Sequence, residues 1–289
     1  MKVIEVRGLT KFYGKNRGVE DLNFEVNEGE IFGFLGPNGA GKTTAIRLML
    51  DFIRADRGKI KIFGMDSKNN AVAIHREIGF ISGENFLYPH MKGRELLSWL
   101  KSFHKHKNGL SLSRLLEIFK LDTKRRIKDY SSGNRKKLAL VQALVHHPKL
   151  LILDEPTNGL DPIMKENLYA VLKSLKGSGT TVFLSSHDLT EVQKVCDRAI
   201  IIKDGRIVDV EDIHELVRKG AAIFDITFVD KPSPEALAGL NVLAQSGKTV
   251  RIQTTGSVQD MLRWLSQYQI ADLSVTKPNI EDIFLTYYK

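Results

Sequence analysis

Hydrophobic and polar residues alternate over short stretches up to Ile81, which is the pattern of β-strands. The predicted strands are Val3–Val6, Leu22–Val26, Ile31–Leu35, a tract near Lys61–Phe63, and Ile78–Ile81. Between Gly93 and Leu121 the apolar residues recur at intervals of three and four instead, as at Leu96, Leu97 and Leu100, so this stretch is predicted to be helical.

From Arg135 onward, short apolar runs of the kind found in buried strands alternate with helical patterns. The predicted strands are Leu150–Leu153, Thr181–Leu184 and Ala199–Ile202, and the helices that alternate with them are Arg135–Val145, Met164–Leu175 and Leu189–Val195. Such alternation favours a largely parallel sheet with helices on its faces. The sequence therefore predicts the α/β class for this part of the chain.

The pattern changes around Val210–Gly220. Beyond it, strand-like alternation at 222–229, 249–254 and 272–276 is accompanied by helical patterns at 258–268 and 280–288. About 75 residues are enough for a small domain. We therefore expect two domains, residues 1–211 and a small α+β domain at 212–289.

Composition narrows the class of protein. Hydrophobic residues make up 42% and charged residues 27% of the chain, as in ordinary globular proteins. No apolar run reaches the ~18 residues of a membrane span, and Met1–Glu5 lacks the apolar stretch of a secretory signal. The single cysteine, Cys196, excludes an internal disulfide and fits a reducing compartment. These features predict a soluble, cytoplasmic protein.

The positive charge is concentrated in the first part of the chain. Of 43 Lys and Arg and 34 Asp and Glu residues, 8 and 9 lie from Asp212 onward, which leaves the first 211 residues with a net charge of +10. A basic surface suits a polyanion, a phosphate-rich ligand or an anionic membrane. A merely solvated surface is the other interpretation.

A phosphate-binding loop is the strongest chemical signal. The pattern G-x-x-x-x-G-K-[ST], followed by one further Thr, is met by Gly36, Pro37, Asn38, Gly39, Ala40, Gly41, Lys42, Thr43 and Thr44. Glycines let backbone N–H groups point at phosphate oxygens, and the following helix adds its positive dipole end. Lys42 can reach the β- and γ-phosphates, and the Thr43 hydroxyl can complete a Mg²⁺ shell. The loop alone predicts nucleoside triphosphate binding and does not choose between kinases, GTPases, helicases and transport ATPases.

Two carboxylates follow the apolar run Leu150–Leu153. Ligands in open α/β sheets bind at the carboxyl ends of the strands, so Asp154 is expected near the phosphate loop, where it can orient Mg²⁺. The side chain of Glu155 points in a different direction and can polarise a water molecule for attack on the γ-phosphate.

Further motifs in this order resemble those of the ATP-binding subunits of ABC transporters. The matches are Tyr130–Asn134 to the signature segment L-S-G-G-Q, Gly159-Leu160-Asp161 to the D-loop, His187 to the switch histidine, and Tyr13 to the aromatic residue that stacks on adenine. The resemblance covers roughly residues 1–215. It is closest to ATPases of the ABC-2 type exporters, because of the short helical insert and the appended C-terminal segment.

The resemblance implies a P-loop NTPase ABC cassette: a mixed, mainly parallel core sheet, an antiparallel β-rich part, and a helical insert at about 83–145. It implies ATP and Mg²⁺ as cofactors and Glu155 and His187 as catalytic residues. Ser131 and Gly133 would hold the ATP of a second cassette in a head-to-tail dimer, and Asp161 would communicate between the cassettes. The chain would energise a separately encoded membrane permease, an exporter, from the inner face of the cell membrane, with no nucleic acid as partner.

The sequence departs from the family pattern at two places. Ser132 and Asn134 replace the usual Gly and Gln of the signature, but both are small and polar. In the Q-loop, where the family has Gln or Glu near Mg²⁺, Gly83 stands at the aligned position and Glu84 follows one residue late. Either Glu84 takes this metal-side role or the contact is missing; we favour Glu84.

Two other functions compete with this interpretation. A soluble ABC-type ATPase acting on nucleic acid or ribosomes usually joins two cassettes, whereas one phosphate loop is present here. A small-molecule kinase of the P-loop class needs neither the signature segment nor His187. The histidines at 104, 106, 146 and 147 are interpreted as loop or packing residues and Cys196 as a buried structural thiol.

Overall fold

The computed structural model describes residues 1–83, 87–102, 111–212, 222–254 and 258–276. The chain divides into two compact units, Met1–Glu211 and Asp212–Lys289. Each unit has its own hydrophobic core, and no described residue belongs to both. Within the described residues, no helix is both long enough and apolar enough to cross a membrane.

An antiparallel sheet opens the first unit. Its strands are β1 (Lys2–Tyr13), β2 (Asn16–Asn27), β4 (Arg57–Ile62) and β5 (Met65–Asp66), in the order β2-β1-β4-β5. The two long strands extend well beyond the predicted tracts. Their inner parts alternate between buried and partly exposed residues, whereas the ends near the β1–β2 turn are mostly exposed. These ends therefore show no hydrophobic alternation from which a strand could be predicted.

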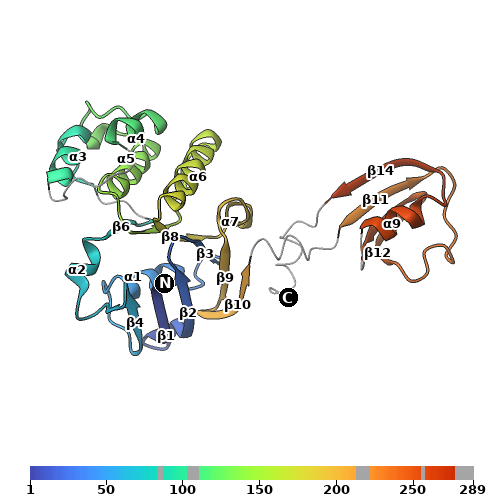
Figure 1. The fold of residues 1–289 in the computed structure, drawn as a ribbon, viewed down its shortest axis with the longest axis horizontal. Coiled ribbons are helices and arrows are strands. Elements are labelled where there is room, and N and C mark those ends of the chain that lie inside the picture. Colours follow the sequence, from blue (N-terminus) through green and yellow to red (C-terminus); the bar gives the residue numbers. More distant parts are fainter. Residues whose placement is uncertain (84–86, 103–110, 213–221, 255–257, 277–289) are drawn as a thin grey trace. The chain divides into compact units, whose positions relative to one another are not determined.

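A six-stranded sheet forms the centre of the first unit (Figure 1). Its order is β10 (Arg206–Asp212), β9 (Arg198–Lys203), β3 (Ile31–Leu35), β8 (Thr181–Ser186), β7 (Leu150–Asp154) and β6 (Ile78–Ile81). The pairs from β9 to β6 are all parallel. β3, β7 and β8 are buried at every residue, which explains their unbroken apolar runs.

Helices cover both faces of this central sheet. Helix α1 (Lys42–Met49) contacts β7 on one side and β2 on the other, so it lies between the two sheets. Phe24 of β2 stacks beside Phe32 and Phe183 of the central sheet in the shared core. Helices α6 (Pro162–Gly177) and α7 (Leu189–Val195) pack on the opposite face.

The predicted helical insert gathers above β6 in Figure 1. It contains α3 (Gly93–Ser102), α4 (Leu112–Ile118), the short 3₁₀ helix η1 (Ile127–Asp129) and α5 (Ser132–Leu144). The small helix α2 (Ala71–His75) precedes β6. Helices α3 and α4 both contact α5, and α5 contacts β6. The predicted class, a mainly parallel core sheet with an antiparallel part and a helical insert, is confirmed.

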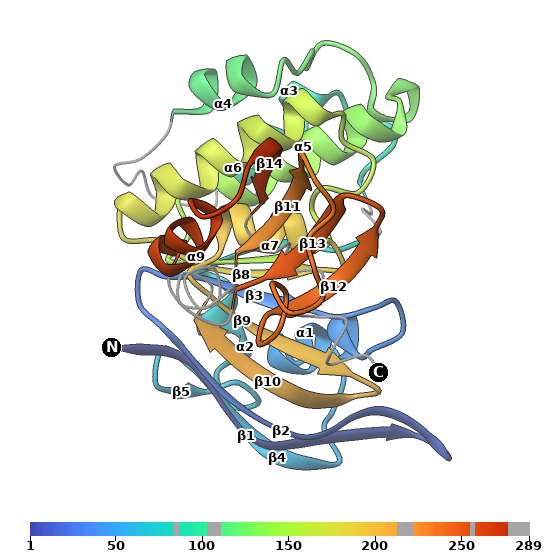
Figure 2. The same ribbon diagram turned by 90° about the vertical axis from the view of Figure 1, so that its right-hand side faces the viewer.

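The second unit is an antiparallel sheet covered by one described helix (Figure 2). The strands β11 (Ile223–Phe228), β12 (Asn241–Ser246), β13 (Thr249–Gln253) and β14 (Ile270–Thr276) are ordered β12-β13-β11-β14, and the helix is α9 (Val258–Leu265). Its core joins Phe224, Ile226 and Phe228 to Met261 and Leu265. The helix predicted at 280–288 lies outside the described residues.

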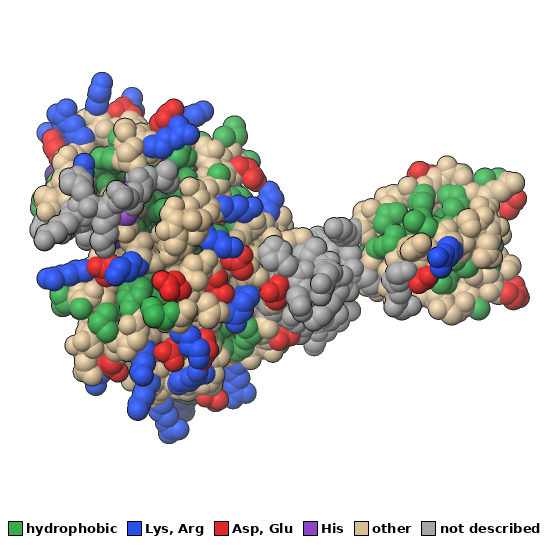
Figure 3. Space-filling view, viewed as in Figure 1, with side chains coloured by type: hydrophobic (Ala, Val, Ile, Leu, Met, Phe, Trp, Pro, Cys, Tyr) green, Lys and Arg blue, Asp and Glu red, His purple; other side chains and the backbone are tan. Residues whose placement is uncertain are grey.

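The two units differ in the surface that they present in Figure 3. Over the first unit, Lys and Arg side chains are interspersed with Asp and Glu rather than gathered in one patch. The visible face of the second unit carries a group of apolar side chains. Val258 and Leu262 of α9 and Leu273 and Val275 of β14 are each between 37% and 48% exposed, so the described residues leave these side chains incompletely covered.

Candidate functional site

The phosphate loop connects β3 to α1, and its glycines are required by the backbone. Gly41, directly before α1, has φ +103°, which side chains other than hydrogen rarely permit. At Gly36 a Cβ atom would lie 2.4 Å from the Ile202 carbonyl oxygen on β9. The loop therefore runs so close to the neighbouring strand that only glycine fits, and helix α1 begins at Lys42 with its N-terminus at the loop.

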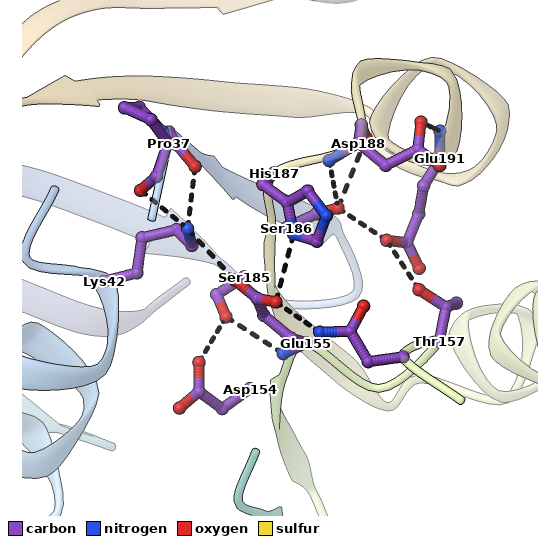
Figure 4. Close-up of polar contacts among 12 residues, drawn as sticks. Pro37, Lys42, Asp154, Glu155, Thr157, Ser185, Ser186, His187, Asp188 and Glu191 are labelled. Carbon is purple, nitrogen blue, oxygen red and sulfur yellow. Dashed lines mark hydrogen bonds and ion pairs between the residues drawn. The ribbon is translucent and has the colours of Figure 1, made fainter. Parts of the chain in front are cut away.

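Lys42 lies buried at the centre of this loop (Figure 4). Its ammonium group donates to the carbonyl oxygens of Gly36 at 2.7 Å and Pro37 at 3.0 Å. It also pairs with Glu155 Oε1 at 3.1 Å. These three contacts use all three donors of the ammonium group.

Asp154 connects the end of β7 to the first turn of α1. Its Oδ2 accepts a hydrogen bond from Thr43 Oγ1 at 2.8 Å, and its Oδ1 accepts one from Ser185 Oγ on β8 at 2.6 Å. The side chain is 2% exposed. A hydroxyl and a carboxylate oxygen side by side are the hard oxygen ligands that Mg²⁺ prefers, so these residues fit that ion.

Glu155 is the residue at which the separate parts of the site meet. Its backbone is left-handed, with φ +47°, and its Oε2 accepts from Asn158 Nδ2 at 2.5 Å and lies 3.0 Å from His187 Nδ1. Burial acts to raise the pKa of its carboxyl, but the hydrogen bond and charge of Lys42, with Asn158 and His187, bring the pKa below its ordinary value. Glu155 is therefore ionised at neutral pH and able to accept a proton or a water hydrogen bond.

A cavity of about 270 Å³ lies beside the phosphate loop. Its lining residues are Tyr13, Arg17, Gly18, Asn38, Gly39, Gly41, Lys42, Thr43, Thr44 and Glu155. The half-exposed Tyr13, predicted to stack on adenine, therefore opens onto the same space as Lys42 and Glu155. Arg17 and Gly18, on the strand that returns from the β1–β2 turn, were not expected from the sequence.

Residues of the predicted signature segment lie elsewhere. Ser131 is the N-cap of α5, and its Oγ accepts from the backbone N–H of Asn134 at 3.2 Å. Among the described residues that line the cavity, none comes from α5. Gly133 instead lies beside the segment after β7, where its Cβ position would be 3.5 Å from the Gly159 carbonyl oxygen.

Asp161 ends the same segment and begins α6. Its Oδ1 accepts from the backbone N–H of Met164 at 2.9 Å, and Pro162 takes the first helical position. Its local role is thus a helix cap, which leaves the predicted role between cassettes a prediction.

The predicted Q-loop is described in part. A cavity of about 400 Å³ is lined by Thr43, Ile46, Arg47, Phe52, Phe80, Ser82, Gly83 and Asp154. The Cβ position of Gly83 lies 4.0 Å from Asp154 Oδ2, the oxygen that accepts from Thr43. Glu84 lies outside the described residues, so the choice between Gly83 and Glu84 stays open.

The minor candidates have ordinary surroundings where they are described. His146 Nε2 lies 3.1 Å from the Ile78 carbonyl oxygen, and Cys196 is buried, which raises the pKa of its thiol. His104 and His106 lie outside the described residues. Within the described residues, no group of three or more His, Cys, Asp or Glu side chains could hold a metal ion.

The sequence analysis missed several supporting residues. Ser185 and Ser186 follow an apolar strand, and this position next to β7 is the signal that could have identified them. Lys136 stands at an apolar-face position of α5, three and four residues before Ala139 and Leu140, and is 4% exposed. Its Nζ donates to the Glu155 carbonyl oxygen at 3.0 Å.

Comparisons with known proteins identify the family of this chain. A family model described as "ABC transporter" matches residues 19–158. The chain is 38% identical to a bacitracin transport ATP-binding protein of Bacillus licheniformis, over 79% of this chain and 76% of the relative. It is 33% identical to Nod factor export ATP-binding protein I of Rhizobium etli, over 99% of this chain and 93% of the relative.

Solved structures give the same picture of the fold. An ATP-binding subunit of an ABC transporter aligns with a TM-score of 0.69 and 28% identity, over 75% of this chain and 92% of the other. A dimeric ATP-binding cassette in a post-hydrolysis state, bound to ADP and Pi, aligns with a TM-score of 0.65 and 23% identity over 73% of this chain and 98% of the other, a likeness of fold.

Proposed function

Because this chain belongs to the family of ABC transporter ATP-binding subunits, we propose that it energises a membrane exporter by cycles of ATP-driven closure and hydrolysis-driven opening of a cassette dimer. ATP binding and hydrolysis are the activities of the family. The exporter and the permease subunit are inferred from the relatives named for bacitracin transport and Nod factor export. The chain would attach to the inner face of the membrane through that permease.

The residues around Lys42 would bind the triphosphate. Backbone N–H groups of the loop and the N-terminus of α1 would bind the phosphates, and the ring of Tyr13 would stack on the adenine. Since all donors of Lys42 are engaged, a phosphate oxygen must replace one of its present acceptors. The Glu155 carboxylate is the exchangeable one, because the other two belong to the loop itself.

Hydrolysis would follow from the release of Glu155. Once its Oε1 is free of Lys42, this ionised carboxylate can orient a water molecule and accept its proton, while His187 and Asn158 hold Oε2. Thr43 and Asp154 would hold Mg²⁺, which when bound neutralises charge on the phosphates. The Lys42–Glu155–His187 arrangement is the observation that carries the proposal.

The second half of the site would come from another copy of the chain. Ser131 uses its oxygen to cap α5, but its hydroxyl hydrogen can still donate to a phosphate, and Gly133 permits close approach. Their absence from the lining of the described cavity fits contact with a second cassette's ATP. The dimeric fold relative supports this arrangement. An ATPase acting on nucleic acid or ribosomes is not favoured, since the relatives are transport and export proteins.

The experiment that tests this function is Glu155→Gln. The variant keeps the shape of the side chain but loses the charge that accepts the proton, so ATP hydrolysis should fall by about 100-fold or more. With ATP and Mg²⁺ it should persist as a dimer in light scattering. Glu166→Gln, an exposed carboxylate on α6, is the control and should keep wild-type turnover. Retained turnover in Glu155→Gln would overturn the assignment.

A mixing experiment tests the contribution from the second copy. Chains with Ser131→Arg and chains with Lys42→Ala should each be inactive, whereas a heterodimer of the two contains one composite site with both residues intact. Mixing should therefore restore part of the hydrolysis. If mixing restores no activity above that of either chain alone, or if either variant is an active monomer, the head-to-tail dimer is contradicted.

A further inference from the structure

Lys136 is a buried lysine that the proposed reaction does not use. It lies on α5, is 4% exposed, and donates from Nζ to the backbone carbonyl oxygen of Glu155 at 3.0 Å. Burial lowers the pKa of its ammonium group, and the charges of Asp154, Glu155 and Glu191 act in the opposite direction. Keeping a lysine in this interior position costs free energy, so a compensating role is expected.

The backbone of Glu155 is fixed by elements that are far apart in the sequence. Its N–H donates to Ser185 Oγ on β8 at 3.1 Å, and its carbonyl oxygen accepts from Lys136 on α5. The residue also has a left-handed φ of +47°, a conformation that non-glycine residues adopt only when their surroundings hold them there. The direction of the Glu155 side chain therefore depends on both contacts.

Helix α5 touches the same segment a second time. Gly133, in its first turn, lies against the carbonyl of Gly159, four residues after Glu155. Helix α5 thus contacts the segment from Glu155 to Gly159 at two places. One is its first turn, which follows Ser131, and the other is Lys136, about one turn further along. A helix is stiff over one turn, so a shift of its N-terminus also shifts Lys136.

We propose that Lys136 is a positioning residue that couples the N-terminal turn of α5 to the carboxylate of Glu155. When Ser131 and Gly133 engage a phosphate of a second cassette, the displacement of α5 is passed through the Lys136 Nζ contact to the backbone of Glu155. The rate of hydrolysis at the site that contains Glu155 thereby depends on how Ser131 and Gly133 of the same chain bind the nucleotide of the second cassette. This inference rests on the proposed roles of Glu155, Ser131 and Gly133.

The test compares two substitutions of Lys136 in the full-length chain. Lys136→Met keeps the length and apolar stem but removes the donor, and Lys136→Gln keeps a shorter donor. A misplacement of the carboxylate should lower the kcat of Lys136→Met by about 100-fold. The Kd for ATP should stay within about twofold of the wild-type value, since Lys42 and the loop are untouched. Lys136→Gln should recover at least about tenfold of the lost kcat.

Two controls separate positioning from folding and from the reaction itself. Lys137→Met makes the same chemical change one residue along α5 and should leave kcat and Kd unchanged. Thermal unfolding midpoints are measured for all variants; if Lys136→Met does not fold, the kcat and Kd of Lys136→Gln decide, with a lower kcat at unchanged Kd expected.

The outcomes distinguish this inference from the proposed function. A kcat for Lys136→Met within about threefold of wild type, while Glu155→Gln is inactive, overturns the coupling role and leaves the function standing. A parallel loss of ATP affinity and kcat in Lys136→Met also overturns it, because that result indicates general damage to the site. Wild-type turnover in Glu155→Gln would instead overturn the proposed function.

Discussion

At the scale of single residues, the ion pair between Lys42 and Glu155 would set the order of events in the proposed reaction. Both side chains are largely buried, with 5% and 17% of their surface exposed, so their attraction is screened less than that of a surface pair. The lysine can bind a phosphate only in exchange for this carboxylate. In the proposed mechanism, the same exchange that admits the nucleotide therefore frees the carboxylate that activates the attacking water molecule.

Glu155→Gln should consequently bind ATP more tightly than the wild-type chain. The amide no longer competes as an anion for Lys42. Even the ~1 kcal/mol that a solvent-exposed ion pair can contribute corresponds to about a fivefold lower Kd. Isothermal titration with ATP and Mg²⁺ measures this Kd directly. A Kd equal to or higher than the wild-type value would contradict the exchange.

Glu191 gives a second prediction at this scale, for stability against pH. It lies in α7 and is 1% exposed; Oε2 accepts from Ser186 Oγ at 2.6 Å and Thr157 Oγ1 at 3.2 Å (Figure 4). Burial, with a smaller contribution from Asp188, raises its pKa from 4.5 to about 7, against the opposing hydrogen bonds and Lys165. Between these two values the folded chain holds a proton that the unfolded chain has lost, so ionisation of Glu191 destabilises the fold as the pH rises.

Glu191→Gln should remove this pH dependence. The free energy of unfolding of the variant, relative to wild type, should rise between about pH 4.5 and 7 by up to about 3 kcal/mol and then stay level. The new amide does not titrate, so it adds only a pH-independent offset to the free energy of unfolding. Its NH₂ group would take the place of Oε1, which has no hydrogen-bond partner among the described residues. Urea unfolding from pH 5 to 8 measures the curve, with the exposed Glu166→Gln as a flat control. A constant offset for Glu191→Gln would refute the raised pKa.

At the scale of elements, the phosphate loop depends on its contact with β9. A Cβ at Gly36 would meet the Ile202 backbone at 2.4 Å, and a backbone atom in a central strand has little room to move. Gly36→Ala should therefore weaken ATP binding at least about tenfold and destabilise the fold by 1 kcal/mol or more, roughly the lower range of overpacking costs.

Gly177→Ala is the matched control for that substitution. Gly177 is the last residue of α6, and nothing lies within 4 Å of its Cβ position. Alanine favours a helix over glycine by up to about 1 kcal/mol, so this variant should be as stable as wild type or more so, with an unchanged Kd. Equal behaviour of the two variants in thermal unfolding and ATP titration would rule out the close approach at Gly36.

The elements also show what the sequence could predict. Strands β3, β7 and β8 agree with the predicted ranges to within two residues, because burial on both faces leaves an unbroken apolar run. Strands β10 and β12 were missed, because exposed and partly exposed residues prevail in both, and the predicted single helical stretch from Gly93 contains two described helices. Polar edge strands carry little hydrophobic signal, so their pairing is decided by tertiary contacts.

The residues of the candidate site likewise include some that the sequence could predict and some that it could not. The loop from Gly36 to Thr44 is contiguous, so its pattern is visible in the sequence. Ser185, Lys136 and Arg17 reach the site from three other elements, and no local pattern joins them to it. Glu155 contacts both Lys42 and His187 because the strands that precede these three residues, β7, β3 and β8, are neighbours in the sheet. A local sequence pattern does not reveal this strand order.

At the scale of the whole molecule, the boundary between the two hydrophobic cores also separates the proposed phosphate-binding residues from the rest of the chain. The core of the first unit ends with Ile202, and Ile207 packs against it, whereas the core of the second unit uses residues from Ala222 onward. Every residue proposed to handle phosphate lies in the first unit. A chain that ends at Asp212, the last residue of β10, therefore loses none of the described core side chains of the first unit.

We accordingly expect residues 1–212 to fold and to bind ATP with a Kd within about twofold of the full-length value, since the binding residues and their core are retained. Dimerisation should weaken, because the removed unit carries the exposed apolar side chains Val258, Leu262, Leu273 and Val275, and such groups favour association. The measurement is ATP titration and light scattering of the truncated chain, both in a Glu155→Gln background to hold the dimer. An unchanged dimer would assign the second unit to another role, such as permease contact. Loss of ATP binding by a folded truncated chain would mean that the second unit contributes to the nucleotide site, against the division proposed from the two cores.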